Sequence, residues 1–472
     1  MEDNRSLLAG LQRLLGREIV SLELYERASH GQDTSGPDLE VENIPAAVVK
    51  PVSAQQVSEV LKYANQHHLP LYVHGAGTAF KGSPRPKRPG SVILSLLGLN
   101  SFAMFEDDLY CEAGAGLNQY ELEKKLAARG YFLPMNIGSK YSATIGGAVA
   151  INTIGHMVDI CLGRIIDYVM GLEVVLPGGE IIETGTRSIR RPAGIDYTRF
   201  FAGTEGLFGV ITKVRLRLLP DFKKAYTVGF FPELTDIARA FMAYYQEKLP
   251  PPLYGEFLDK LACATPFGMR GLGEPPGHMA LATTIGHTQQ EADRQAMEMV
   301  RIFQAQGAVK AFQVTSAKEQ EDYWASRDNI LNILQATESK ARPTRLGSLE
   351  AAVPLSRLAE SIAYLQSGHG HDILYGAKPF IYGHVGTCDL HAMWVISEEW
   401  PLEKRKQAAA EITVLEGEIN LKWGCASGEI GQTAARIAFL RQRYGEDAFS
   451  LLLKVKNALD PNGILNPGNL ED

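Results

Sequence analysis

The chain has 472 residues, which is too long for one ordinary domain, so we expect two or three. Its composition, 45% hydrophobic and 21% charged, is normal for a globular enzyme, and its net charge of −7 without a long Lys/Arg run argues against a nucleic-acid partner. No apolar run is long enough to span a membrane, and the amphipathic, acidic N-terminus lacks the pattern of a secretory signal.

The cysteines are widely spaced and form no CxxC pair. They are Cys111, Cys161, Cys263, Cys388 and Cys425. This spacing argues against an iron–sulfur cluster or a structural zinc within the chain. It favours a reducing compartment, so we expect a cytoplasmic protein.

The first part of the chain reads as a strand–helix–strand unit after an N-terminal helix and an irregular lead-in of about 45 residues in all. Residues 47–50 predict a short strand, residues 53–67 a helix, and residues 71–74 and 91–96 two further strands. Ser53 and Gln56 have the spacing of a capping box. Val57, Val60, Leu61 and Ala64 fall on one face of that helix.

Further along, residues 109–114 predict a strand and residues 118–129 a helix that Asn118 caps. A hairpin follows at residues 171–185, with its turn at 177–179, and residues 207–219 are strongly β. After about residue 221, helices alternate with separated strands to about residue 395, which indicates an inserted α+β domain. From Trp400 onward the chain is mostly helical.

A glycine-rich loop, GAGTAFKG at residues 75–82, follows a predicted strand, where backbone N–H groups can approach phosphates. It is not a GxGxxG fingerprint, and no GxxxxGK[ST] occurs, so NAD or a nucleoside triphosphate on a standard motif is disfavoured. One such loop alone is more often a tight turn without a ligand. Three loops of this character occur at residues 75–82, 138–155 and 203–212, and together they favour a ligand-binding role.

In these segments the chain resembles the vanillyl-alcohol oxidase / p-cresol methylhydroxylase superfamily, and more closely its D-lactate, glycolate and D-2-hydroxyglutarate dehydrogenase branch. The family's motifs appear here as PAAVVKP at 45–51, G-x-G-T at 75–78, ATIGG at 143–147 with a following Asn152, and GTEGLFGVIT at 203–212. The C-terminal LDPNGILNPG at 459–468 also agrees.

The resemblance implies that these loops hold FAD. The cofactor-binding residues would be Gly75, Ala76, Gly77, Thr78 and Gly82 at the pyrophosphate, with Gly138, Ser139, Thr144, Gly146, Gly147, Asn152, Glu205, Gly209 and Ile211 around the rest, and Asn466 closing over the flavin. Some relatives carry a histidine linked covalently to FAD where Thr78 stands. Threonine cannot form that link, so we expect non-covalent FAD.

Two histidines, His384 and His391, lie seven residues apart in the glycine-flanked segment GHVGTCDLH. The glycines permit both imidazoles to converge, and Glu429 in SGEIG would complete a site for a divalent metal. Taken alone, such a pair is more often structural or exposed. The resemblance implies that these three residues bind a metal, zinc or manganese, that orients the substrate. It also places Arg327 of WASR on a substrate carboxylate, although a surface or helix-end arginine is an equal alternative.

The chain departs from the family pattern around this metal triad. Ile430 replaces the histidine credited with taking the hydroxyl proton, and isoleucine cannot act as a base. Ser348 replaces a lysine, Met393 replaces an asparagine, and residues 387–389 read TCD instead of DGN. Either another group accepts the proton, or the substrate is not an ordinary 2-hydroxy acid.

We therefore expect an α+β protein with a two-subdomain FAD-binding domain of p-cresol methylhydroxylase type at 1–222, an inserted α+β cap domain at 223–424, and a C-terminal helical segment at 425–472 that returns to the FAD domain. The expected activity is a 2-hydroxy acid dehydrogenase that passes electrons to an iron–sulfur subunit, an electron-transfer flavoprotein or a quinone. Two alternatives stay open: a dehydrogenase for a different alcohol or bulkier hydroxy acid, and an electron-transfer subunit whose substrate site has decayed.

Overall fold

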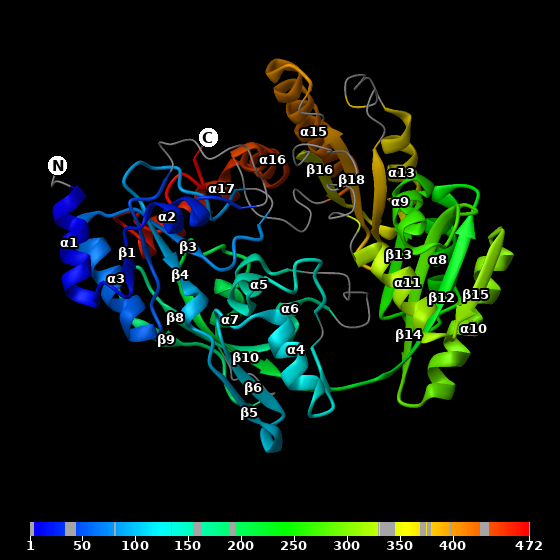
Figure 1. Ribbon diagram of the computed structural model, residues 1–472, viewed down its shortest axis with the longest axis horizontal. Helices are drawn as coiled ribbons and strands as arrows, with labels where there is room; N and C mark the ends of the chain where they lie inside the picture. The colour runs from blue at the N-terminus through cyan, green and yellow to red at the C-terminus, as the bar shows by residue number, and fades with distance from the viewer. Residues whose placement is uncertain are drawn as a thin grey trace.

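The structure is a computed structural model that describes residues 4–33, 44–79, 82–133, 135–153, 163–188, 194–328, 330, 345–368, 374, 379–396, 399–424 and 434–471. In these ranges the chain forms two halves, and the largest hydrophobic cluster of each half is separate from that of the other (Figure 1). None of the helices in these ranges is long and apolar enough to cross a membrane.

The first half contains two larger sheets. One has the order β1-β2-β4-β3, and its strands are β1 (Val20–Ser21), β2 (Ala47–Val49), β3 (Leu71–His74) and β4 (Val92–Ser95). The other has the order β5-β6-β10-β8-β9, and its strands are β5 (Phe102–Phe105), β6 (Tyr110–Gly114), β8 (Val169–Val175), β9 (Ile181–Glu183) and β10 (Val210–Arg217). A short pair lies apart from them, β7 (Tyr131–Phe132) with β11 (Leu219–Pro220).

Helices cover these sheets. They are α1 (Asn4–Leu15), α2 (Leu24–His30), α3 (Ala54–His67), α4 (Gln119–Ala127), α5 (Ile145–Ile151), α6 (Ile165–Tyr168) and α7 (Tyr197–Phe201), with 3-10 turns η2 (Leu96–Gly98) and η3 (Glu106–Asp108). The sequence predicted most of these elements, including the hairpin β8–β9. It missed β1, α2, β5, β7, α5, α6 and α7, which are short and lack a clear period.

Helix α3 shows why the prediction succeeds where local signals are strong. Its apolar face is buried, and the side chain of Ser53 accepts a hydrogen bond from the backbone N–H of Gln56 at 3.3 Å. The reciprocal bond differs from the expected capping box, because the Gln56 side chain accepts from the N–H of Val52 rather than from Ser53. Both bonds still satisfy donors at the helix start.

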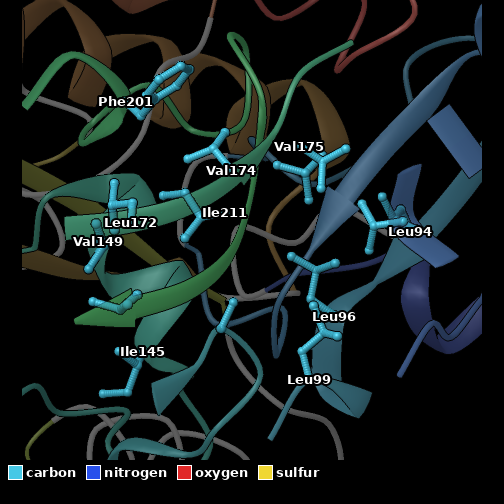
Figure 2. Packing of buried hydrophobic residues seen from close by; sticks show 14 of the residues in the cluster. Leu94, Leu96, Leu99, Ile145, Val149, Leu172, Val174, Val175, Phe201 and Ile211 are labelled. Atoms are coloured by element: carbon cyan, nitrogen blue, oxygen red, sulfur yellow. The ribbon is translucent and has the colours of Figure 1, made fainter. Parts of the chain in front are cut away.

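The core of the first half lies between its strands and α5 (Figure 2). Leu172, Val174 and Val175 of β8 pack with Ile211 of β10, and Leu94 joins them from β4 (Figure 2). This packing fixes the positions of the loops that follow β3 and precede α5 and β10. The core therefore supports the predicted cofactor loops directly.

The second half, which we call the cap, is built on a seven-stranded antiparallel sheet of order β15-β12-β14-β13-β17-β18-β16. Its strands are β12 (Lys223–Phe231), β13 (Tyr254–Leu258), β14 (His278–Gly286), β15 (Lys310–Val314), β16 (Arg345–Ala352), β17 (Phe380–His384) and β18 (Asp389–Ile396). Its helices are α8 (Leu234–Gln246), α9 (Lys260–Arg270), α10 (Gln289–Ala305), α11 (Ala317–Asp328), α13 (Leu358–Ser367) and α15 (Leu402–Trp423), with 3-10 turn η4 (Leu355–Arg357).

The chain then returns to the first half through α16 (Ala434–Tyr444) and α17 (Glu446–Leu459), which lie beside the N-terminal elements in Figure 1. Lys456 anchors this return. Its buried ammonium donates to the carbonyls of Leu207 and Leu465, both at 2.9 Å, and to Asp460 Oδ2 at 2.5 Å. The two ends of the chain thus belong to one packed unit, whereas the boundaries at 222 and 424 remain predictions.

Candidate active site

A cavity of about 490 Å³ is lined by residues of both halves. The first half contributes most of the predicted cofactor residues, namely Gly75, Ala76, Gly77, Thr78, Gly138, Ser139, Thr144, Gly146, Gly147, Glu205, Gly209 and Ile211. The cap contributes Arg327, Ile330, Glu350, Tyr382, His384, His391 and Met393. Residues that the sequence predicted for a cofactor and for a substrate therefore share one cavity.

The glycines of this wall allow close backbone approach. Gly77 has φ +68°, and a Cβ there would lie 3.0 Å from the ring of His74. A Cβ on Gly75 would lie 2.7 Å from Thr144 Oγ1, and one on Gly146 would lie 2.8 Å from the carbonyl oxygen of Ala115. These positions exclude larger side chains and leave a backbone-lined surface, which is the kind of wall that a pyrophosphate and a flat ring need.

Three predicted cofactor residues lie outside the cavity lining and support it instead. Asn152 ends α5 in the left-handed conformation at φ +54°. The N–H of Gly82 donates to Asp33 Oδ2 at 2.8 Å, which ties the first loop to the N-terminal segment. Asn466 accepts from the N–H of Val73 at 2.9 Å and donates to the carbonyl of Glu205 at 2.8 Å.

The register of the cap strands determines which side chains form the cavity wall opposite the cofactor loops. On β17 and β18, Tyr382 is the partner of His391, which is also the partner of Glu350 on β16. Glu256 on β13 is the partner of His384. Since side chains alternate along a strand, these residues point to one face of the sheet, and that face borders the cavity.

A buried ionic cluster lies in this wall. Glu256 and Arg327 are only 2% and 4% exposed, and Arg327 Nε donates to Glu256 Oε2 at 2.7 Å. The other carboxylate oxygen, Oε1, lies 2.6 Å from His384 Nδ1. Burial by itself would raise the pKa of Glu256, but Arg327 and His384 outweigh it and hold that pKa below its usual range.

Aromatic stacking holds the same groups in place. The ring of Tyr382 stacks on His391 with centroids 5.0 Å apart, and the guanidinium carbon of Arg327 lies 4.9 Å from the Tyr382 centroid. The rings of His384 and His391 are 5.3 Å apart in an edge-to-face arrangement. The predicted histidine pair therefore does converge, with Arg327 beside it.

Glu429, the third predicted metal ligand, and Ile430 lie outside the described residues. Among the described ones, no group of three or more His, Cys, Asp or Glu is arranged to hold a metal ion. The metal prediction is thus not supported by what the structure describes. The Glu256 contact on His384 Nδ1 is nevertheless compatible with it, because metal-binding histidines commonly donate their other ring N–H to a carboxylate.

Two of the departures from the family pattern, Ser348 and Met393, are neighbours in the cap sheet. Met393 is buried, lines the cavity, and is the cross-strand partner of Ser348. With Ile330 it makes part of this wall apolar.

The sequence missed Glu256, Glu350 and Tyr382. A local signal existed for both glutamates, since each stands in an otherwise apolar strand, YGEFL or LEAA, at a position whose neighbours are buried. A charged side chain in such a strand needs a partner, so it marks a site or a buried ion pair.

Comparison with known families agrees with this geometry. Residues 45–185 match the family described as FAD binding domain, and residues 221–470 match the family described as FAD linked oxidases, C-terminal domain. The second match alone covers more than half of the chain.

Several relatives of similar length have been described. D-lactate dehydrogenase of Archaeoglobus fulgidus is 29% identical over 431 residues, which is 90% of this chain and 90% of that protein. Glycolate oxidase subunit GlcD of Bacillus subtilis is 28% identical, over 91% of this chain and 89% of that protein. Mitochondrial D-2-hydroxyglutarate dehydrogenase of Rattus norvegicus is 27% identical, over 89% and 77%.

Solved structures share the fold at lower identity. p-Cresol methylhydroxylase with substrate bound superposes with a TM-score of 0.78 at 18% identity, over 100% of this chain and 97% of that one. An alkyldihydroxyacetonephosphate synthase superposes with a TM-score of 0.77 at 17% identity, over 99% and 85%. The glycine-lined cavity, the two matching family domains and this shared architecture show that the chain belongs to the FAD-linked oxidases and is an FAD-dependent oxidoreductase.

Proposed function

We propose that this protein is a dehydrogenase that oxidises a small 2-hydroxy acid of the D-lactate or glycolate kind and passes the electrons to a partner acceptor. The observation that carries the proposal is the single cavity in which the FAD loops face Arg327, His384 and His391. The names of the relatives, which include D-lactate dehydrogenase and a glycolate oxidase subunit, support the same substrate class.

The cap residues have distinct tasks in this proposal. Glu256 holds Arg327 at its Nε, and we assign the guanidinium group of Arg327 to the substrate carboxylate. The two histidines lie where the substrate hydroxyl would be held. The substrate carbon would then face the glycine-lined wall, and the stacked Tyr382 keeps the imidazole of His391 in one orientation.

When bound, FAD supplies the hydride acceptor, while the protein supplies position and electrostatics. The residues of the first half would hold it without a covalent bond, because Thr78 has no nucleophilic nitrogen at the position of the linked histidine in some relatives. Acid precipitation should therefore release all flavin into the supernatant. Flavin that stays with the polypeptide would contradict the non-covalent proposal.

A divalent metal, zinc or manganese, on His384, His391 and Glu429 forms part of the proposal, and the converging rings support it. Elemental analysis of protein prepared without a histidine tag should find about one metal per chain. His384→Ala should lose the metal and most of the activity while keeping the flavin spectrum. Substoichiometric metal, together with unchanged turnover in that variant, would show that these three residues do not bind a metal that the activity needs.

A second candidate is a dehydrogenase for a larger, more apolar hydroxy acid. The sequence favours it through Ile430 and Met393, and Met393 is buried in the cavity wall where the family pattern has an asparagine. Ile330 adds a second buried apolar side chain to the same wall. The two candidates differ in the size of the preferred side chain. Turnover that rises from lactate to branched or aromatic 2-hydroxy acids would select the second.

The experiment is anaerobic bleaching of the flavin with a panel of D- and L-2-hydroxy acids and simple alcohols. A small D-2-hydroxy acid should bleach the oxidised flavin band within the turnover time. FAD that binds stoichiometrically but is bleached by no compound of the panel would contradict the dehydrogenase proposal. That result would favour the alternative of an electron-transfer subunit whose substrate site has decayed.

A separate experiment tests whether the electrons go to a partner acceptor rather than to oxygen. The acceptor would be an iron–sulfur subunit, an electron-transfer flavoprotein or a quinone. Turnover with an artificial dye should exceed turnover with air as the sole acceptor. Equal rates would identify an oxidase instead.

A further inference from the structure

Glu256, unlike Glu350, does not line the cavity, yet it contacts two residues that do. Its two oxygens serve different partners, Arg327 from α11 and His384 from β17. One buried carboxylate thus connects the group that would bind the substrate carboxylate with a group at the substrate hydroxyl.

We propose that Glu256 is the positioning residue of this site, and that it fixes His384 in the tautomer whose Nε2 lone pair faces Arg327 and the cavity. This inference deepens the proposed function and rests on it for its kinetic part. It assigns a role to a residue that itself never touches the substrate.

The tautomer follows from the hydrogen-bond geometry. A carboxylate only accepts hydrogen bonds, so the 2.6 Å contact with Glu256 Oε1 requires that His384 Nδ1 carries the hydrogen and donates it. The neutral ring then has its lone pair on Nε2. Arg327 Nη2, which can only donate, lies 3.5 Å from that Nε2, and a second N–H there would face a like donor.

The lone pair is what the chemistry needs at this place. A histidine accepts a proton or binds a metal only through a ring nitrogen that carries no hydrogen. Since Ile430 cannot accept a proton, the orientation of the remaining imidazoles decides whether the substrate hydroxyl meets an acceptor. Glu256 also holds Arg327 by its Nε, and this arrangement places Arg327 Nη2 3.5 Å from His384 Nε2.

Glu256→Gln tests the assignment because glutamine has the same shape. Arg327 Nε needs an oxygen, so the new amide NH₂ turns toward His384 Nδ1, which must then accept, and the hydrogen moves to Nε2. We expect FAD content to be unchanged and the rate of anaerobic flavin reduction to fall roughly 10²–10⁴-fold, as when a histidine is held in the wrong tautomer. Oxalate, an unreactive carboxylate, should still perturb the flavin spectrum with a Kd within about threefold of wild type.

A matched control changes a partly buried carboxylate that also pairs with an arginine. Glu112 on β6 accepts from Arg215 Nε and Nη2 at 3.0 and 2.8 Å within the sheet of the first half, and neither residue lines the cavity. Glu112→Gln should therefore lower stability without changing the reduction rate. A similar loss of rate in both variants would show that the Glu256 effect is only structural, and would overturn the inference.

The tautomer can also be observed without turnover. ¹⁵N-histidine spectra of the wild-type holoprotein should contain a neutral ring protonated on Nδ1 that disappears in His384→Ala. The inference is overturned if that ring carries its hydrogen on Nε2, or if Glu256→Gln reduces its flavin at the wild-type rate. Failure of every hydroxy acid to bleach wild type would instead count against the proposed function, and the spectra would still decide the role of Glu256.

Discussion

At the scale of single residues, the cofactor wall depends on positions where a side chain cannot be accommodated. Gly77 combines two constraints, a φ of +68° and a space in which a Cβ would come within 3.0 Å of the His74 ring. The first constraint costs a non-glycine residue about 1–2 kcal/mol, and for a β-branched residue it is severe. The second would displace the loop that follows β3.

Gly77→Val is therefore expected to lose FAD, with affinity weakened roughly 100-fold or more, which corresponds to about 3 kcal/mol. Gly130→Val is the matched control, since Gly130 has φ +76° but nothing within 4 Å of its Cβ. It should show the backbone strain and keep its flavin. Flavin content after desalting, from the absorbance ratio of flavin to protein, checks both. Full FAD occupancy in Gly77→Val would refute the assigned role of this loop.

At the scale of elements, α2 and β3 meet through two histidines. His30 ends α2, His74 ends β3, and their rings are 5.3 Å apart. His74 Nδ1 donates to the carbonyl of Gly75 at 2.9 Å, which links this contact to the first cofactor loop. Burial, and then the neighbouring His30, lower the pKa of His74 to about 4.

This pKa predicts a pH dependence of stability. Between pH 4 and 6.5 the unfolded chain binds a proton at His74 that the folded protein does not, so stability is complete above about 6.5 and is lost as pH falls toward 4. A shift from 6.5 to about 4 corresponds to about 3 kcal/mol. Urea unfolding of wild type and His74→Gln at several pH values across this window gives the free energy of unfolding. This free energy should depend less steeply on pH in the variant than in wild type.

The exposed His287 provides the control for that measurement. In His287→Gln the free energy of unfolding should depend on pH as it does in wild type. Parallel curves for wild type and His74→Gln would show that His74 titrates normally in the folded protein.

At the scale of the whole molecule, the C-terminal segment holds the first half together from the other end of the chain. Asn466 links the N–H of Val73, 393 residues earlier, to the carbonyl of Glu205, 261 residues earlier. Its backbone is left-handed at φ +47°. It thus connects the end of β3 with the loop that contains Glu205, while its closing over the flavin stays a prediction.

Asn466→Gly removes the side chain and keeps the backbone conformation accessible. It leaves two backbone groups without their partner, at about 1–3 kcal/mol for each that stays buried, so FAD affinity should fall by about tenfold or more. Asn462→Gly removes an exposed amide that donates to Asn65, and it should change little. Titration of the apoproteins with FAD measures both, and equal affinities in the two variants would contradict this role of Asn466.

The sequence predicted those features that are encoded within about fifteen neighbouring residues. Helix α3 follows from its period and its cap, the hairpin β8–β9 from its turn, and the cofactor loops from glycines whose conformations other residues rarely adopt. It also predicted Arg327 and both histidines as site residues, and the structure brings these three together. The third metal ligand, Glu429, lies outside the described residues.

By itself, then, the sequence determined the cofactor class, the main secondary structure and the residue types at the site. Only the tertiary structure decided which groups are partners, because the partners come from strands and helices far apart in the chain. Glu256 lies 71 residues before Arg327 and 128 before His384. Their contact depends on the register of β13 against β17, and a slip of one residue would turn Glu256 to the other face of the sheet. No local pattern encodes that register, since it results from how the whole cap sheet packs.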